Sequence, residues 1–161
     1  MNQRGVVLSI HLQRQRSQPP VRADEARALV DRGLEGDYHG KHRPGSARQV
    51  LLVDRRTLEA LGFAHGALRE QLTVDFPGLD ALRTGARLRV GDAVLEVTGS
   101  CEPCEVIGAV NAVADPTALR ESLRGRRGML TKVVAVAGDG RIRPGDAVAA
   151  APASEIPSAP R

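Results

Sequence analysis

The sequence predicts a mainly β fold with short helices, arranged as a small barrel or closed sheet. Strand-like segments outnumber helical ones, and they pair as hairpins with no regular strand–helix–strand alternation. Aromatic residues make up only 2% of the 161 residues and tryptophan is absent, so the core must be aliphatic. A chain of this length supports one domain, which we place at residues 1–149.

The N-terminal third begins with a predicted strand. Residues 5–12, Gly-Val-Val-Leu-Ser-Ile-His-Leu, have the β-branched content of a strand. A polar loop that ends in Pro-Pro follows it. Residues 22–32 then predict a short helix, because Ala26, Leu29 and Val30 fit helical spacing and a glycine follows the segment.

Residues 33–46 hold four glycines, two histidines and one proline, with no periodicity. They predict a long loop, and such loops in compact domains are usually functional or disordered. The glycines permit close approach of the backbone to a ligand, and His39 could bind an anion or move a proton. An ordinary exposed loop is the alternative.

Residues 48–53 predict a strand that leads directly into a helix at residues 55–61. Asp54 is a suitable N-cap residue, because its carboxylate can accept hydrogen bonds from the free amides of the first turn. Gly62 can adopt the left-handed conformation that ends a helix.

Residues 86–98 predict a β-hairpin with a two-residue Gly-Asp turn. This register places Leu88 opposite Leu95 on a wholly apolar face. It also places Arg87 opposite Glu96 on the other face, as a cross-strand pair of opposite charge. We therefore expect the hairpin to pack on the core.

The C-terminal part predicts a short helix and two further strands. Asp115 is the N-cap of a helix over residues 116–123, which begins with proline. Residues 131–137 and 147–149 predict strands. Residues 150–161 are rich in alanine, proline and serine, and are expected to be a disordered tail.

Charge and composition limit the classes of partner. The net charge is +4, and of the 23 basic residues only Lys41 and Lys132 are lysines. Arginine suits recognition of phosphate or another oxyanion, whereas the scarcity of aromatic rings argues against a nucleic-acid partner. No apolar run approaches the ~20 residues of a membrane span. Without an export signal, we expect a cytoplasmic protein with reduced thiols.

The chain has two cysteines, Cys101 and Cys104, in a Cys-Glu-Pro-Cys sequence. They could form a redox pair, half of a zinc site or one reactive thiol with a neighbour, or be two small buried side chains. Redox exchange is disfavoured because a hairpin precedes the motif and residues 105–113 are a poor helix. Zinc needs two more ligands, for which His39 and His42 are the candidates.

A second basic motif, Gly-Arg-Arg-Gly at residues 125–128, combines guanidinium groups with a flexible backbone. It could bind a phosphate through Arg126 or Arg127. A solvated turn after a helix is the alternative.

These segments, in this order, resemble the MOSC domain, the C-terminal module of molybdenum-cofactor sulfurases. The resemblance extends from about residue 6 to residue 148. It is carried by residues 36–39, 48–52, 58–62, 69–73, 85–97, 101–104, 125–128 and 142–148.

The resemblance implies a β-barrel-like fold and a role for Cys104 in sulfur or molybdenum chemistry. In this family the matching cysteine is thought either to carry a persulfide sulfur or to bind the metal of the molybdenum cofactor, molybdopterin. A soft thiolate suits both roles. Cys101 has a supporting role. The family is also associated with pyridoxal phosphate proteins.

The resemblance and the chemistry of the side chains also define an expected cofactor pocket. Arg126 or Arg127 would bind the phosphate of the cofactor, and Asp37, His39 and Thr73 would line the pocket. The complete expected cofactor-binding set is Asp37, His39, Arg48, Glu70, Thr73, Arg126 and Arg127. The usual Glu-Asn-Leu-Thr of the family has Gln71 at its second position here, which lengthens the amide side chain by one methylene.

The function implied is that of a stand-alone MOSC protein that binds molybdenum cofactor or carries sulfur as a cysteine persulfide. A cysteine desulfurase would be a partner for sulfur transfer. Reduction of N-hydroxylated compounds would need a separate reductase, because the chain has no cysteine set for an iron–sulfur cluster. Two alternatives stay open: a non-catalytic module that binds a small anion or a partner, and a thiol–disulfide oxidoreductase.

Overall fold

The computed structural model describes residues 3–42, 44–103 and 106–152. Its strands are β1 (Arg4–Leu12), β2 (Val21–Ala23), β3 (Ala26–Leu29), β4 (Gly33–Leu34), β5 (Val50–Asp54), β6 (Leu72–Asp75), β7 (Arg87–Val90), β8 (Ala93–Ser100), β9 (Met129–Val136), β10 (Arg141–Ile142) and β11 (Ala147–Ala150). The helices are α1 (Tyr38–His42), α2 (Arg55–Leu61), α3 (Val106–Val110), α4 (Pro116–Ser122) and the 3-10 helix η1 (Leu79–Ala81).

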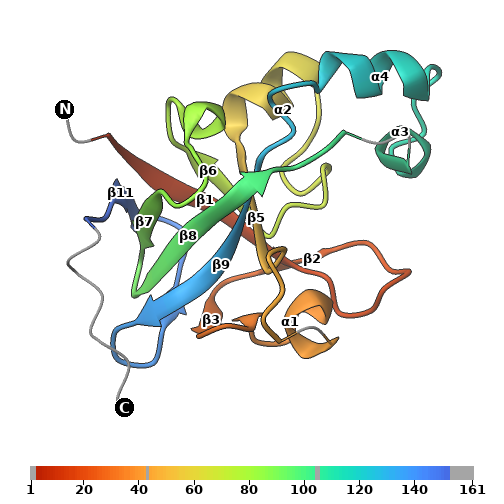
Figure 1. Ribbon diagram of the computed structural model, residues 1–161. Helices are drawn as coiled ribbons and strands as arrows, with labels where there is room; N and C mark the ends of the chain where they lie inside the picture. The colour runs from red at the N-terminus through yellow and green to blue at the C-terminus, as the bar shows by residue number, and fades with distance from the viewer. Residues whose placement is uncertain (1–2, 43, 104–105, 153–161) are drawn as a thin grey trace.

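Seven strands close into a barrel. The main sheet has the order β11-β7-β8-β9-β5-β6-β1-β2, and β11 also pairs with β1, so β2 is the one strand of this sheet outside the ring. The described strands β10, β3 and β4 form a separate small sheet in that order. Neighbouring strands of the ring are antiparallel except for β5 and β6, which are parallel. Figure 1 shows β8 and β9 running diagonally across the view as part of the barrel wall, with α2, α3 and α4 above the strands and α1 below them. The predicted mainly β, barrel-like fold is confirmed.

The inside of the barrel is the larger of two apolar cores. It is filled by alternate residues of the ring strands, and Phe76 is its only aromatic side chain among the described residues. Aliphatic side chains fill the rest, as the composition predicts. Representative members are Val7, Ile10, Val50, Leu52, Leu72, Val90, Leu95, Val133 and Val148.

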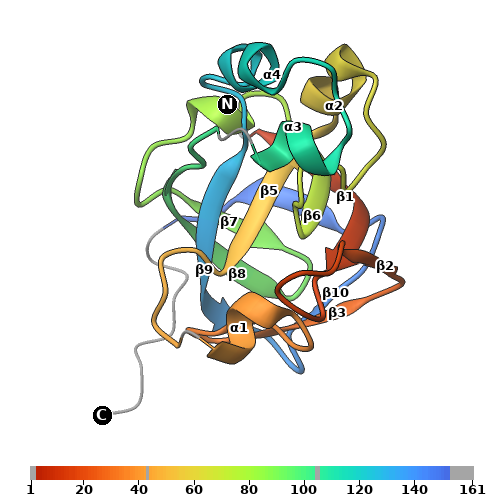
Figure 2. The ribbon, with the colours of Figure 1, turned by 90° about the vertical axis from the view of Figure 1, so that its right-hand side faces the viewer.

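The smaller core lies between the outer face of the barrel and the helices. In β5, Val50 and Leu52 face the barrel interior, whereas Leu51 and Val53 belong to the outer core. Burial on both faces explains why the whole strand is apolar up to its last residue. Figure 2 shows α2, α3 and α4 at one end of β5 and α1 at the other.

Two local predictions are confirmed in detail. The carboxylate of Asp54 accepts a hydrogen bond from the Arg56 amide at the start of α2, and Gly62 ends that helix in the left-handed conformation with φ 69°. The hairpin of β7 and β8 has the expected register, and the side chains of Arg87 and Glu96 form an ion pair of 3.0 Å across it.

The prediction of a helix over residues 22–32 is wrong. This segment forms β2 and β3, and the chain returns in β4. Ala26 and Ala28 are buried while Arg27 is exposed, which is the two-residue alternation of a strand. Three apolar residues at helical spacing could not outweigh pairing of β3 with β10 and β4.

The prediction of an irregular loop over residues 33–46 is only partly right, because this segment contains β4 and the short helix α1. No prediction covers β6, β10 or η1, and α3 forms within residues 105–113, which were expected to be a poor helix. The expected start of the disordered tail at residue 150 is wrong, because Ala150 belongs to β11. Residues 153–161 of the expected tail lie outside the described residues. Over the described ranges, no helix is long and apolar enough to cross a membrane.

Candidate functional site

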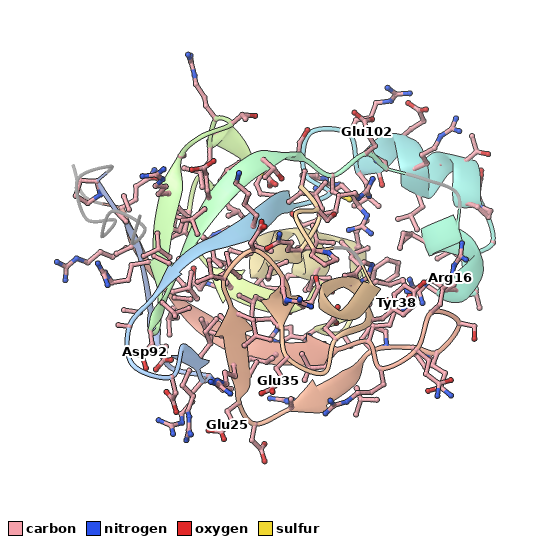
Figure 3. All side chains as sticks on the ribbon, turned by 60° about the horizontal axis from the view of Figure 1, so that its bottom comes forward. Arg16, Glu25, Glu35, Tyr38, Asp92 and Glu102 are labelled. Atoms are coloured by element: carbon pink, nitrogen blue, oxygen red, sulfur yellow. The ribbon has the colours of Figure 1, made fainter. Side chains whose placement is uncertain are left out.

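A cleft of about 470 Å³ opens on the outer face of β5 and β9, between α1 and α3. Figure 2 faces this side of the barrel, and Figure 3 shows Arg16 and Tyr38 on it, away from Asp92 at the tip of the β7–β8 hairpin. Its size is within the range of small-molecule and cofactor sites. The cleft is lined by Gln13, Arg16, Tyr38, His39, Ser46, Arg48, Leu51, Arg69, Gln71, Cys101, Ile107, Arg127 and Leu130.

A buried carboxylate organises one wall of the cleft. Asp37 is 1% exposed and accepts hydrogen bonds from the Gln13 amide at 2.8 Å and the His39 amide at 3.0 Å. It also lies 3.0 Å from His39 Nδ1, and the Gln71 amide donates to it at 3.3 Å. The carboxylate therefore fixes both His39 and Gln71 at the cleft wall. The imidazole of His39 is 42% exposed and can contact a ligand.

Gln71 adapts to its longer side chain through a second contact. Its Oε1 accepts a hydrogen bond of 2.8 Å from the backbone amide of Leu51 in β5. Its Nε2 remains directed at Asp37. The glutamine thus links α1 to the barrel while it lines the cleft.

Arg127 lies in the cleft wall with an unsatisfied guanidinium group. The residue is 6% exposed, and its Nε and Nη1 have no hydrogen-bond partner among the described residues. A buried cation without partners is costly, whereas an oxyanion in the cleft could accept both hydrogen bonds. Arg127 is therefore the described side chain that most directly indicates an anionic ligand.

The backbone beside Arg127 is held in place from two sides. Gly128 has φ 111°, and a Cβ there would lie 2.5 Å from the Leu52 carbonyl oxygen, so only glycine allows this approach to β5. The Gly128 carbonyl accepts a hydrogen bond of 2.9 Å from the Cys101 amide. This bond places the start of the Cys-Glu-Pro-Cys segment next to Arg127.

Asp80 in η1 lies on the other side of the same segment and contacts the Gly128 backbone. Burial, and then the charge of Asp54, raises the pKa of the Asp80 carboxyl to about 6. The carboxyl thus contacts the backbone next to Arg127 and is not among the residues that line the cleft.

The cleft brings together five of the predicted site residues: His39, Arg48, Cys101, Arg127 and, through its hydrogen bonds, Asp37. Arg48 is exposed at the rim. Cys101 is 7% exposed and its thiol lies 3.9 Å from the Glu102 carbonyl oxygen. Cys104, the predicted reactive cysteine, lies outside the described residues.

Glu70, Thr73 and Arg126 are not among the residues that line the cleft. Glu70 and Thr73 are fully buried, and the Thr73 hydroxyl donates to Glu70 at 3.1 Å. The Leu68 amide also donates to Glu70, and burial raises the pKa of the Glu70 carboxyl. Arg126 instead donates to the Ser122 carbonyl at 2.7 Å. Glu70 and Thr73 thus shape the turn before β6, behind the cleft wall.

Sequence reasoning did not single out Gln13, Arg16, Arg69 or Ile107 as site residues. Arg16 lies in the polar loop after β1, which gave no chemical signal by itself. Arg69 is the first residue of the segment 69–73, which carries part of the family resemblance. This position is the signal that could have identified Arg69 as a site residue. No group of three or more His, Cys, Asp and Glu side chains within the described ranges could hold a metal ion.

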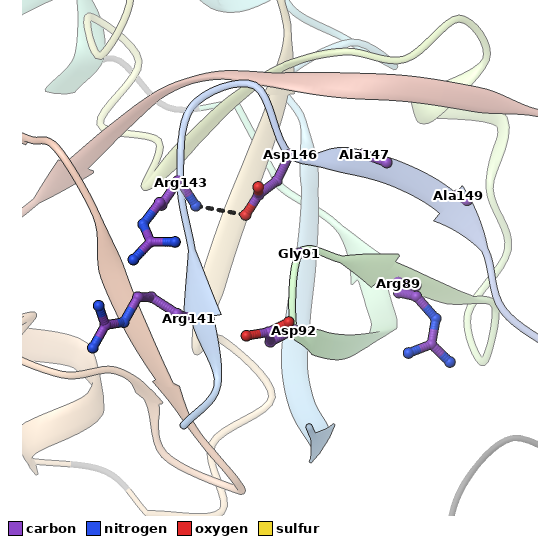
Figure 4. Close-up of a pocket in the computed structure, with 8 residues that line it drawn as sticks. All are labelled: Arg89, Gly91, Asp92, Arg141, Arg143, Asp146, Ala147 and Ala149. Carbon is purple, nitrogen blue, oxygen red and sulfur yellow. Dashed lines mark hydrogen bonds between the residues drawn. The ribbon is translucent and has the colours of Figure 1, made fainter. Parts of the chain in front are cut away.

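A second, smaller hollow of about 250 Å³ lies near the β7–β8 turn (Figure 4). Its charges are balanced locally. Arg141 pairs with Asp139 at 2.8 Å, Arg143 pairs with Glu25 at 3.1 Å, and the Arg143 amide donates to Asp146. Among the described residues, none of the buried side-chain donors without a partner lines this hollow.

A family model for the MOSC domain matches residues 37–149, and the chain belongs to this family. No curated protein sequence matched the chain.

Solved structures share the fold at low sequence identity. The YuaD protein from Bacillus subtilis superposes with a TM-score of 0.75 at 19% identity, covering 93% of this chain and 97% of its own. YiiM from Geobacillus stearothermophilus gives a TM-score of 0.70 at 16% identity, with 92% and 75% covered. YiiM from Escherichia coli gives 0.66 at 18% identity, with 94% and 70% covered.

Proposed function

We propose that this protein binds molybdenum cofactor in the cleft and carries sulfur on Cys104. The MOSC family is associated with this cofactor, and membership of the family is the first support. The observation that carries the proposal is the buried guanidinium of Arg127, whose Nε and Nη1 lack partners among the described residues. The phosphate of the cofactor would supply the missing acceptors.

The residues of the cleft fit such a ligand. Arg127 and Arg48 would hold the phosphate, and His39, fixed by Asp37, would contact the polar ring system. Leu51, Ile107 and Leu130 provide an apolar wall that excludes water from the buried end of the cleft. When bound, the cofactor would supply a metal centre for oxygen-atom or sulfur chemistry.

The proposed sulfur step uses only the thiol of Cys104. Its thiolate would attack the outer sulfur of a persulfide on a cysteine desulfurase, and a new S–S bond would form on Cys104. The S–S bond of the donor would break, and the donor would leave as a thiolate, so no net oxidation occurs. Cys101 and Ile107, on either side of Cys104 in the sequence, both line the cleft.

Two measurements on the purified protein test the proposal. The full chain is expressed in a host that makes molybdenum cofactor, and molybdenum is measured by elemental analysis while intact mass reports a persulfide. We expect metal, a persulfide adduct or both in wild type, and loss of the adduct in Cys104→Ser. Cys101→Ser is the matched control and should retain it. If wild type contained no molybdenum and no persulfide adduct, the proposed function would be excluded.

A small-anion binding module is the second candidate, favoured by the basic lining of the cleft. It predicts that Cys104→Ala leaves anion binding unchanged and that no molybdenum accompanies the protein. Reduction of N-hydroxylated compounds would be a further activity of the cofactor-bound form, and its test is turnover with a separate reductase added.

A further inference from the structure

The cleft carries more positive charge than one phosphate can balance. Four arginines line it, Arg16, Arg48, Arg69 and Arg127, and no aspartate or glutamate is among its described lining residues. None of these four guanidinium groups forms an ion pair with a carboxylate within the described ranges. A phosphate monoester carries about −1.5 to −2 charges near neutral pH, so it offsets at most two of the four.

Other arginines of the protein show that this arrangement is not general. Arg55 pairs with Glu59 at 2.7 Å and with Asp75 at 3.1 Å, and Arg87 pairs with Glu96 at 3.0 Å. In the cleft, like charges gather instead, and their mutual repulsion is relieved when an anion binds. The excess of arginine therefore indicates a second anionic group.

Two loops hold Arg16 and Arg69 at the same side of the cleft. The Gln13 side chain donates to the carbonyl oxygens of Gln15 at 3.2 Å and Arg16 at 2.7 Å, which fixes the loop after β1. Arg69 donates from Nη2 to the Gln18 carbonyl at 3.3 Å and so joins the two loops. Its backbone has φ 62°, a strained conformation that persists because its surroundings hold it.

We infer that Arg16 and Arg69 form an outer anion site that binds the anionic group of the substrate. The substrate class is then a small organic oxyanion, with a carboxylate or phosphate group at its end away from the reacting centre. This inference rests on the proposed function, because it assigns the buried Arg127 and the rim residue Arg48 to the cofactor. Guanidinium groups bind either oxyanion through paired hydrogen bonds.

The test measures inorganic phosphate binding by calorimetry in a full-length Arg127→Met background, where the inner guanidinium is absent. We expect Arg16→Gln with Arg69→Gln to weaken phosphate binding by at least about tenfold. Arg4→Gln with Arg83→Gln is the matched control, because both are exposed arginines outside the cleft. It removes the same charge and should change the affinity by less than about twofold. Acetate, titrated in parallel, distinguishes a carboxylate site from a phosphate site.

A second readout separates this inference from the proposed function. In otherwise wild-type protein, Arg16→Gln with Arg69→Gln should leave the cofactor content unchanged. Loss of cofactor would mean that these arginines bind the cofactor itself, and equal phosphate affinity in all variants would mean that no outer site exists. Either result overturns the inference. The single variant Arg16→Gln is the reserve if the double variant does not fold. Absence of cofactor from wild type would instead contradict the cofactor-binding part of the proposed function, and the phosphate titration would still decide whether the outer site exists.

Discussion

At the scale of single residues, the cleft is organised by two side chains with opposite hydrogen-bonding states. Asp37 is buried and fully engaged, with bonds to Gln13, His39 and Gln71. Arg127 is buried, and two of its nitrogens have no hydrogen-bond partner among the described residues. A buried carboxylate with all its hydrogen bonds, such as Asp37, makes the cleft wall rigid. A buried guanidinium without partners, such as Arg127, lowers the stability of the protein until a ligand binds.

The first prediction concerns the energetic cost of Arg127. Arg127→Met keeps most of the buried volume and removes the unpartnered cation, so we expect the ligand-free protein to gain about 1 kcal/mol in free energy of unfolding. Urea denaturation measures it. Arg126→Met is the matched control, because Arg126 is less buried and already bonds the Ser122 carbonyl. A loss of stability in Arg127→Met would show that the guanidinium is satisfied in the ligand-free protein.

The second prediction concerns the pH dependence of Asp80, whose pKa is raised from 3.8 to about 6. The folded protein then holds this proton more tightly than the unfolded chain, so the contribution to stability is present below the ordinary pKa and is lost as pH rises through about 6. The free energy of unfolding of Asp80→Asn relative to that of wild type should therefore rise by about 1 kcal/mol between pH ~4 and pH ~7. This value is reduced for partial solvent screening.

Urea denaturation at several pH values measures this gain. The exposed Asp24, changed to Asn, is the control and should show no such trend. A difference between Asp80→Asn and wild type that stays constant over this pH range would contradict the account.

Sequence reasoning found some of these residues and missed others for identifiable reasons. Asp37, His39 and Arg127 lie in motifs with a chemical signal, in a glycine-rich segment and an Arg-Arg pair. Arg16 and Arg69 reach the cleft through the path of two loops, which no local pattern encodes.

At the scale of elements, the segment between α4 and β9 positions Arg127. Gly128 makes this possible, because its positive φ and its approach to the Leu52 carbonyl leave no room for a side chain. Gly128→Ala should therefore cost at least about 2 kcal/mol and displace Arg127. Gly125→Ala is the matched control: φ is also positive there, at 75°, but nothing lies within 4 Å of the new Cβ.

Thermal and urea denaturation measure both glycine variants. We expect Gly125→Ala to lose only about 1 kcal/mol, the cost of the backbone conformation alone. Equal losses for Gly125→Ala and Gly128→Ala would mean that the approach to β5 is not what requires glycine.

Elements with strong local signals were predictable, and those that depend on distant partners were not. The capped helix α2 and the β7–β8 hairpin follow from a few neighbouring residues. β3 instead depends on β10, which lies far along the chain, and β6 joins β5 by a parallel pairing across the intervening α2. Local spacing alone therefore favoured a helix for residues 22–32.

At the scale of the whole molecule, stability depends on closure of the ring between β1 and β11. Val148 is fully buried in β11 and lies opposite Gly5 of β1 and Val90 of β7. Val148→Ala should cost about 2 kcal/mol, from two lost methyl groups and the cavity left behind. Val21→Ala is the matched control, since Val21 is 55% exposed in β2, outside the ring.

Urea denaturation followed by two probes measures this effect. We expect a single cooperative transition in both variants, and a change within about 0.5 kcal/mol for Val21→Ala. A change in free energy of unfolding for Val148→Ala as small as that for Val21→Ala would mean that the barrel does not unfold as one closed unit. Two probes that report separate transitions for Val148→Ala would mean the same.

We propose that the cleft around Arg127 holds molybdenum cofactor. The most direct test is the cofactor content of Arg127→Met compared with Arg126→Met and wild type, all made in a cofactor-producing host. Molybdenum by elemental analysis and the pterin by fluorescence report it. The account predicts cofactor in wild type and Arg126→Met, and a loss of at least about tenfold in Arg127→Met. Equal cofactor content in the two arginine variants would contradict it.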